Sequence, residues 1–151
     1  MDDRLGFVGD ITDVNAQPIL DLLERGYIPV VSTVGFDADG NVYNINADTA
    51  AARIAGALGA ESMICMTDVP GLLRDPADPS TLIPLVTLAG VDKLLAEGCI
   101  SGGMLPKTAC CTDAQNRGVK KAMILDGRIP HAILMEMLTD EGVGTMFVRE
   151  E

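Results

Sequence analysis

The sequence has few aromatic residues and few positive charges. Phe and Tyr make up 3% of its 151 residues, Trp is absent, and 11 Lys and Arg stand against 22 Asp and Glu, which gives a net charge of −11. Proteins that bind nucleic acids use basic surfaces and often stack bases on aromatic rings. The composition therefore argues against a nucleic-acid partner. A nucleotide ligand is still compatible with it, because one local positive site and Mg²⁺ are sufficient.

Histidine and cysteine are also scarce, and their spacing is not that of a metal site. The chain has one histidine, His131, and no Cys-x-x-Cys pair, so we expect no protein-bound metal. Free thiols are typical of a reducing cytosol. No signal peptide and no apolar run of membrane-spanning length is present, so we expect a cytoplasmic protein without a membrane partner. The four cysteines are Cys65, Cys99, Cys110 and Cys111.

The pattern of apolar residues and turn signals predicts one α/β domain. Strands and helices alternate, with a hairpin at Asp39-Gly40, so we expect a three-layer αβα sandwich with a mainly parallel sheet and an inserted β-hairpin. The predicted helices are 17–25, 48–58, 91–97, 105–117 and 130–138. The predicted strands are 27–32, 62–67, 121–125 and 144–148, with a hairpin over 36–43 and an extended piece over 7–12.

A first polar cluster comprises Asn44, Asn46 and Asp48, where a strand gives way to an Ala-rich helix. In α/β proteins such junctions at the carboxyl ends of strands hold the ligand. The alternative is ordinary helix capping, which needs only one Asn or Asp. Three polar groups two residues apart are more than a cap requires, but both readings stay open.

A second cluster comprises Gly102, Gly103 and Lys107, at the start of a predicted helix. A glycine-rich turn, a helix N-terminus and an ammonium group together suit an anionic phosphate. A lysine at this end opposes the helix dipole and needs a compensating anion, which a phosphate would supply. The alternative is an ordinary surface lysine. The pattern is neither a Walker A loop nor a Rossmann fingerprint.

Two further residues have a functional and a structural interpretation. Asp68 follows a predicted strand and precedes Pro70-Gly71, so it either contacts a ligand or forms a turn. His131 begins a predicted helix. A helix-start or packing role is favoured over catalysis for this histidine, because one imidazole without a partner makes no catalytic constellation.

These elements resemble the amino acid kinase family, and within it the C-terminal half of the acetylglutamate kinases. The most specific elements are Asn44-x-Asn46-Ala47-Asp48 and Gly102-Gly103-Met104-x-x-Lys107, which are distinctive together and weak singly. The resemblance covers nearly the whole chain in order. The matching stretches are 6–10, 26–31, 43–48, 67–73, 102–107, 124–128 and 140–146.

The resemblance implies a reaction and a set of roles. MgATP, with Mg²⁺ held mainly by the nucleotide phosphates, would phosphorylate the side-chain carboxylate of N-acetyl-L-glutamate in arginine biosynthesis. Such catalysis rests on positioning and charge neutralisation rather than on a base. The implied residues are Asn44 and Asn46 for the substrate, Asp48 and Lys107 for catalysis, and Asp68, Gly103, Met104 and Lys107 for the nucleotide. In catalysis, Asp48 would hold the catalytic lysines in position and Lys107 would neutralise charge on the transferring phosphoryl group.

The resemblance also implies that residues 1–151 form a single C-terminal nucleotide-binding lobe. On this reading the chain does not include the N-terminal substrate lobe, which in the family carries a first lysine, glycine-rich phosphate loops and a substrate-gripping arginine. We therefore expect little turnover by the chain alone, an apolar surface towards the missing lobe, and a homo-oligomeric parent protein.

The region near the C-terminus resembles family members that arginine inhibits. This resemblance makes His131, Glu136 and Gly142 candidate contacts for an arginine effector, against the alternative of solvated charges at a helix end. Other readings of the whole chain are another amino acid kinase, such as a carbamate, glutamate 5- or aspartate kinase, and a non-catalytic module that binds a nucleotide or arginine.

Overall fold

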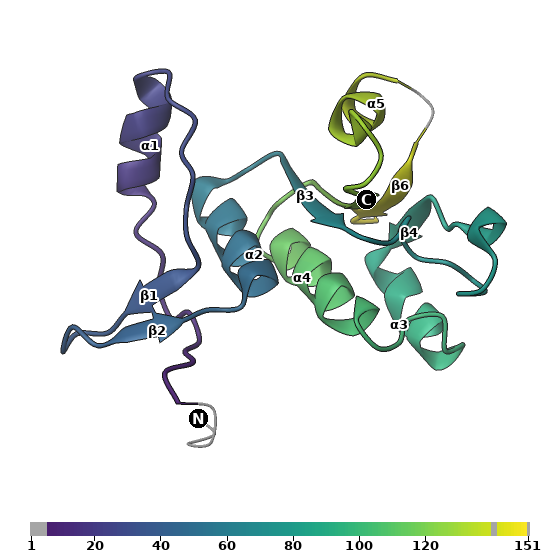
Figure 1. Ribbon diagram of the computed structural model, residues 1–151, viewed down its shortest axis with the longest axis horizontal. Helices are drawn as coiled ribbons and strands as arrows, with labels where there is room; N and C mark the ends of the chain where they lie inside the picture. Colours follow the sequence, from purple (N-terminus) through teal and green to yellow (C-terminus); the bar gives the residue numbers. More distant parts are fainter. Residues whose placement is uncertain (1–5, 140–141, 151) are drawn as a thin grey trace.

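Figure 1 shows the chain as a computed structural model, which describes residues 6–139 and 142–150. The helices are α1 (Gln17–Glu24), α2 (Ala47–Leu58), α3 (Leu88–Ala96), α4 (Met104–Asn116) and α5 (Ala132–Leu138), with a short 3₁₀ turn, η2 (Pro79–Thr81). The strands are β1 (Val34–Phe36), β2 (Val42–Asn44), β3 (Ser62–Thr67), β4 (Leu85–Thr87), β5 (Lys121–Asp126) and β6 (Gly144–Val148).

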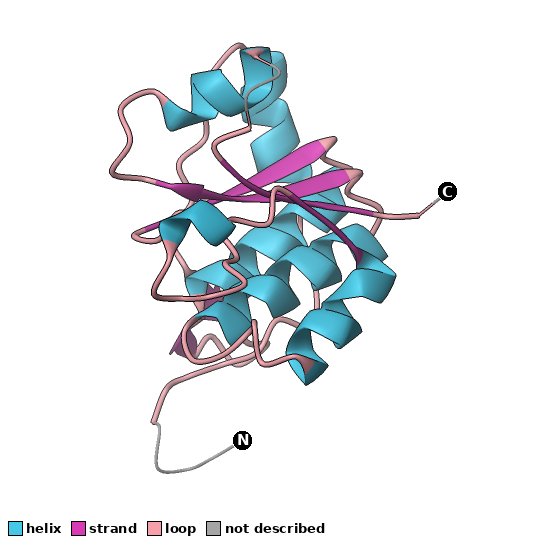
Figure 2. Cartoon of the chain, turned by 90° about the vertical axis from the view of Figure 1, so that its right-hand side faces the viewer, coloured by secondary structure: helices cyan, strands magenta, loops and turns pink. Residues whose placement is uncertain are grey.

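The main sheet has four strands in the order β3-β5-β6-β4. The β3–β5 and β4–β6 pairs are parallel, and β5 and β6 run antiparallel in the middle. Helices α2, α3 and α4 lie on one face of this sheet and α5 lies on the other (Figure 2). The predicted three-layer α/β architecture is confirmed, with a sheet that is mainly parallel and carries one antiparallel pairing.

The core lies between the sheet and the α2–α4 pair. From Ala122 to Asp126, every β5 residue is buried, as expected for a strand covered on both faces. Small buried residues on α4, among them Cys111 and Ala114, let this helix approach the sheet closely. Helix α2 ends at Gly59, whose φ of 61° is the left-handed conformation that glycine adopts readily.

The loop between β3 and β4 is fastened to β6 by one threonine. The Thr145 hydroxyl is completely buried, accepts a hydrogen bond from the Leu72 amide at 2.8 Å and donates one to the Ile83 carbonyl at 2.8 Å. One side chain therefore fixes both ends of a loop segment that begins close to Asp68. This loop was expected to be irregular, and the strand β4 that follows it was not predicted.

The hairpin and α1 lie to the side of α2, away from the main sheet (Figure 1). The hairpin is confirmed: β1 pairs antiparallel with β2, and the Asp37 carboxylate accepts hydrogen bonds from Asn41 and Tyr43. These bonds, with that of Asn41 first among them, hold the pKa of Asp37 at about 2, below its usual value. The expected extended piece over 7–12 contributes a single bridge, Val8 to Asn44.

The predicted buried strand over 27–32 is wrong. These residues have no regular structure, and the side chains of Ile28 and Val30 are 90% and 96% exposed. A strand needs a neighbour for its backbone hydrogen bonds, and no strand within residues 6–139 or 142–150 pairs with this run. Large exposed apolar residues gather in this part of the chain: Phe7, Leu22, Leu23, Tyr27, Ile28, Val30, Val31, Val34, Phe36 and Val42.

Within the described ranges, no helix combines the length and the apolar character that a membrane span requires.

Candidate functional site

The N-terminal turns of α2 and α4 bring a carboxylate and an ammonium group together. Asp48 lies in the first turn of α2 and Lys107 in the first turn of α4, and their Oδ2 and Nζ atoms are 3.4 Å apart. The two side chains are 24% and 23% exposed, so the pair is sheltered but open to a ligand. The anion expected to compensate Lys107 is, in this structure, Asp48. The sequence separates these residues by 59 positions.

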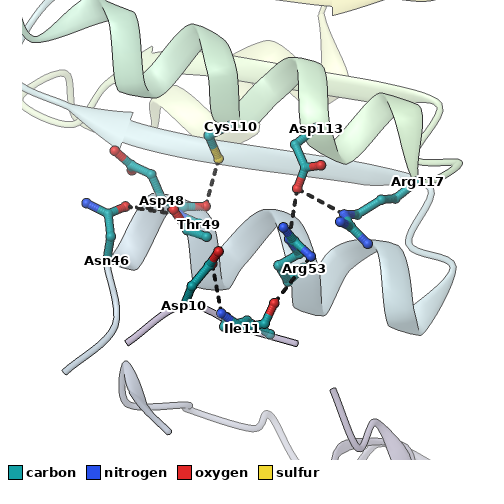
Figure 3. Close-up of polar contacts among 9 residues, drawn as sticks. All are labelled: Asp10, Ile11, Asn46, Asp48, Thr49, Arg53, Cys110, Asp113 and Arg117. Carbon is teal, nitrogen blue, oxygen red and sulfur yellow. Dashed lines mark hydrogen bonds and ion pairs between the residues drawn. The ribbon is translucent and has the colours of Figure 1, made fainter. Parts of the chain in front are cut away.

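Asn46 is the N-cap of α2. Its Oδ1 accepts a hydrogen bond from the Thr49 amide at 3.0 Å, so the capping interpretation holds for this residue (Figure 3). Asn44 ends β2, where its backbone amide donates to the Phe7 carbonyl and its side chain is exposed. Of the three residues of the first cluster, one caps the helix, one is paired with Lys107 and one faces solvent.

The turn before α4 faces open space on its outer side. A Cβ atom built on Gly102 or Gly103 would meet no atom of the described residues within 4 Å. Gly102 has a φ of 53°, so its backbone conformation explains the glycine. Gly103 has the ordinary right-handed helical conformation, φ −66° and ψ −13°, and neither its backbone nor its packing requires a glycine. The described residues therefore leave the backbone at Gly103 open, so that a ligand can approach it closely.

The helix N-terminus itself contributes less than the sequence suggested. The amides of Met104 and Leu105 donate to the carbonyls of Ser101 and Gly102, and Pro106 has no amide hydrogen. These groups are therefore committed within the turn, and the positive character of the site comes mainly from Lys107.

A second group of charges lies where β3 and β5, which run parallel, both end. Arg128 binds the Asp126 carboxylate through two side-chain hydrogen bonds of 2.9 and 2.8 Å. This guanidinium holds the pKa of Asp126 at about 2, and Asp126 and, more weakly, Asp68 raise the pKa of Arg128. Asp68 is exposed and accepts a hydrogen bond from Thr67 at 3.3 Å. Sequence reasoning named Asp68 and missed this ion pair beside it.

Two of the three candidate effector residues, Glu136 and Gly142, lie close together in the structure, and the third, His131, does not join them. Glu136 Oε2 accepts a hydrogen bond from the Val143 amide at 2.9 Å, and a Cβ atom on Gly142 would lie 3.8 Å from the same oxygen. His131 lies at the other end of α5, where it is the N-cap residue with a φ of 62°. The remainder of that stretch, Asp140 and Glu141, lies outside the described residues.

The described residues offer no metal site, and the groove described below contains none of the predicted site residues. Among residues 6–139 and 142–150, no group of three or more His, Cys, Asp and Glu side chains could hold a metal ion. A groove of about 390 Å³ lies between α3 and α4, and Val91, Leu95 and Leu105 are among the residues that line it.

Comparisons with known proteins identify a family and similar sequences. The model of the amino acid kinase family matches residues 1–126. The acetylglutamate kinase of Brachyspira hyodysenteriae is 54% identical over 99% of this chain and 52% of its own length. The acetylglutamate kinase of Thermosynechococcus vestitus is 51% identical over 97% of this chain and 50% of its own length. The chain thus spans about half the length of the curated relatives it matches.

Solved structures share the fold. The N-acetylglutamate synthase of Neisseria gonorrhoeae, complexed with coenzyme A and N-acetyl-glutamate, superposes with a TM-score of 0.84 at 23% identity, over 96% of this chain and 33% of that one. The family model matches residues 1–126, which is most of the 151-residue chain, and this leads to one assignment: the chain belongs to the amino acid kinase family.

Proposed function

We propose that this chain is the nucleotide-binding half of an acetylglutamate kinase. The complete enzyme would transfer the γ-phosphoryl group of MgATP to the side-chain carboxylate of N-acetyl-L-glutamate, a step of arginine biosynthesis. The observation that carries the proposal is the open glycine turn at Gly103, which neither backbone nor packing explains, next to the Lys107 ammonium group. The names of the two relatives support the same reaction.

Lys107 would neutralise charge on the transferring phosphoryl group. The transition state of phosphoryl transfer spreads negative charge over the equatorial oxygens, and a fixed cation stabilises that charge. Asp48, at 3.4 Å, would keep the ammonium group in position. The attacking carboxylate is already ionised at neutral pH, so the reaction needs no general base. A site without a histidine is consistent with this chemistry.

The nucleotide would lie over the turn at 101–104, with Gly103 and Met104 against its phosphates and Asp68 at the edge of the sheet. We propose that Mg²⁺ comes with the nucleotide and is held mainly by its phosphates. The absence of a three-residue metal cluster among the described side chains is compatible with this arrangement. A hard cation such as Mg²⁺ is commonly bound through one or two protein groups and several phosphate oxygens.

Asn44 and Asn46 would contact the N-acetylglutamate. The Oδ1 atom of Asn46 is engaged by Thr49, which leaves the Nδ2 group as its donor to a substrate oxygen. Helix capping and substrate binding are therefore compatible, because they use different atoms of one amide.

We further propose that a second lobe covers the exposed apolar surface formed by α1, the hairpin and residues 27–32. Exposed apolar patches of this kind mark contact surfaces, and the acetylglutamate kinases are about twice as long as the matched region. The unpaired run 27–32 would there gain the strand neighbour that it lacks among the described residues. The chain alone would contain half of the phosphoryl-transfer site and show little turnover, and the parent protein would be a homo-oligomer.

Arginine is the proposed effector. Glu136 and the adjacent Gly142 would receive its guanidinium or α-amino group, with His131 as a further contact. The Glu136 carboxylate has a second oxygen besides the one bonded to Val143, and charge-assisted hydrogen bonds to a carboxylate are strong.

A chimera tests the proposed reaction. The N-terminal half of the Brachyspira hyodysenteriae enzyme, joined to this chain, should form acyl phosphate from N-acetyl-L-glutamate, measured by trapping with hydroxylamine. Carbamate, glutamate and aspartate serve as competing acceptors. The Lys107→Ala chimera should lose activity. A folded chimera that prefers another acceptor, or that keeps its rate without Lys107, would contradict the proposal.

A further inference from the structure

Three of the four cysteines form one cluster behind the Asp48–Lys107 pair. Cys65 lies on β3, and Cys110 and Cys111 are consecutive on α4; their side chains are 7%, 5% and 0% exposed. The Sγ atoms of Cys65 and Cys110 are 4.0 Å apart. Cys99 is in a different environment, where its thiol faces the Arg74 carbonyl at 3.8 Å. The proposed phosphoryl transfer uses none of these thiols.

The Cys65–Cys110 distance is suited to a disulfide. The sulfur atoms of a disulfide are about 2.0 Å apart, so closure requires the two atoms to approach by about 2 Å. Rotation of a cysteine side chain about its Cα–Cβ bond moves the sulfur by more than this. The adjacent thiols of Cys110 and Cys111 are worse partners for each other, because consecutive residues on a helix point in different directions.

The two thiols differ in their readiness to react. The Cys110 thiol has one hydrogen, which it donates to the Asp48 carbonyl at 2.8 Å, and this bond holds Cys110 in its neutral form. In the contact between the two sulfurs Cys65 is therefore the donor; burial disfavours its thiolate, and the positive charge of Lys107 favours it. Because the thiolate is the reactive form, Cys65 is the attacking sulfur and Cys110 the second, resolving sulfur.

We propose that Cys65 and Cys110 are a peroxide-sensitive dithiol, and that their oxidation to a disulfide loosens the first turn of α2 by removing the Cys110–Asp48 hydrogen bond to α4. The oxidant class is a hydroperoxide, with hydrogen peroxide as the simplest member. The Cys65 thiolate attacks one peroxide oxygen, the O–O bond breaks, and the departing hydroxide takes up a proton to give water and a sulfenic acid. The Cys110 sulfur then attacks the Cys65 sulfur and expels a second water, which carries the Cys110 proton. Two thiols and one hydrogen peroxide thus give one disulfide and two waters.

Oxidation changes the contact between α4 and α2 directly. In the reduced structure the Cys110 thiol donates a hydrogen bond to the Asp48 carbonyl at 2.8 Å (Figure 3). A disulfide has no S–H group, so this bond is lost, and the Cys110 sulfur moves towards β3. Asp48 is the residue whose carboxylate pairs with Lys107. The cluster therefore links the redox state of buried thiols to the position of the N-terminal turn of α2.

The test uses the 151-residue chain without a nucleotide, so its outcome is independent of the proposed kinase activity. The folded chain is treated with increasing hydrogen peroxide, remaining thiols are alkylated, and the protein is digested without reductant for mass spectrometry. We expect a Cys65–Cys110 crosslink with the loss of two hydrogens. The crosslink should persist in the matched control Cys99→Ser and be absent in Cys110→Ser, in which Cys65 should carry a sulfenic acid that a dimedone probe traps. The wild-type crosslink map stands even where a variant fails to fold.

Amide hydrogen exchange tests the consequence. The crosslinked chain should exchange faster at the start of α2, and dithiothreitol should restore the slow exchange. Oxidation of Cys99 alone, or a Cys65–Cys110 link that forms only in denaturant, would overturn the proposal that Cys65 and Cys110 react as a pair in the folded chain. A native crosslink with unchanged exchange at the start of α2 would overturn its coupling to that helix.

Discussion

Replacing Thr145 by valine tests how the loop that follows Asp68 is held on the sheet. Valine has nearly the same shape as threonine, so the change removes the hydroxyl group and leaves no large cavity. It removes the hydrogen bonds to the Leu72 amide and the Ile83 carbonyl, both 2.8 Å long, in a place where the Thr145 side chain is completely buried. Two backbone groups would then be buried without the partner that they have now.

Each buried polar group left unpaired costs about 1–3 kcal/mol, so Thr145→Val should lower the free energy of unfolding by about 2–6 kcal/mol. Thr145→Ser is the matched control, because it keeps the hydroxyl and loses one methyl group, at about 1 kcal/mol. Urea unfolding followed by far-UV circular dichroism measures both variants. A valine variant as stable as the serine variant would refute the argument that this hydroxyl fastens the loop.

Two further predictions concern the packing of β6 and the charges at the end of β5. A Cβ atom on Gly144 would collide with the Ile124 backbone oxygen, so Gly144→Ala should lower the free energy of unfolding in urea by about 1–3 kcal/mol or more. Gly103→Ala is the control: its Cβ atom lies in open space, so it should change this free energy little. Equal losses of stability in the two variants would contradict the packing argument. Arg128 lowers the pKa of Asp126 to about 2, so the stability that this ion pair contributes should be complete above the unfolded-state pKa near 3.9 and should decline as the pH falls towards 2. In an NMR titration, Arg128→Ala should raise the Asp126 pKa towards its usual value, and an unchanged pKa would show that the guanidinium is not its cause.

Much of the fold could be predicted because its signals are local. An Ala-rich composition and Gly59 indicate α2, Pro106 and Gly118 indicate the two ends of α4, and Asp39-Gly40 indicates the hairpin turn. The strand β4 was missed because Leu85–Thr87 has only three residues, too few for a periodic pattern. The run 27–32 was predicted as a strand from its β-branched composition, but a strand also needs a neighbour, and composition contains no information about pairing.

The site is harder to predict because it depends on contacts between distant residues. Spacing alone placed Asn46 and Lys107 near ligands, and the structure shows that Asn46 also caps α2 and that Asp48 is the counterion of Lys107. The resemblance to the family, and not the spacing, implied that Asp48 positions a lysine. The thiol cluster had only a weak signal. Alternation along β3 places Cys65 on the buried face, but nothing local connects it to Cys110, which lies 45 positions later.

The central claim is that the open turn at Gly103, with Lys107, receives the phosphates of a nucleotide. Calorimetric titration of the chain with a non-hydrolysable MgATP analogue tests this most directly, with Gly103→Ala and Lys107→Ala measured in parallel. We expect the wild type to bind and Gly103→Ala to bind more weakly at unchanged stability. Lys107→Ala should lose about 1.5–3 kcal/mol of affinity, which is roughly a 10- to 100-fold increase in Kd. A folded wild-type chain that does not bind the analogue, or binding that both variants retain in full, would contradict the account.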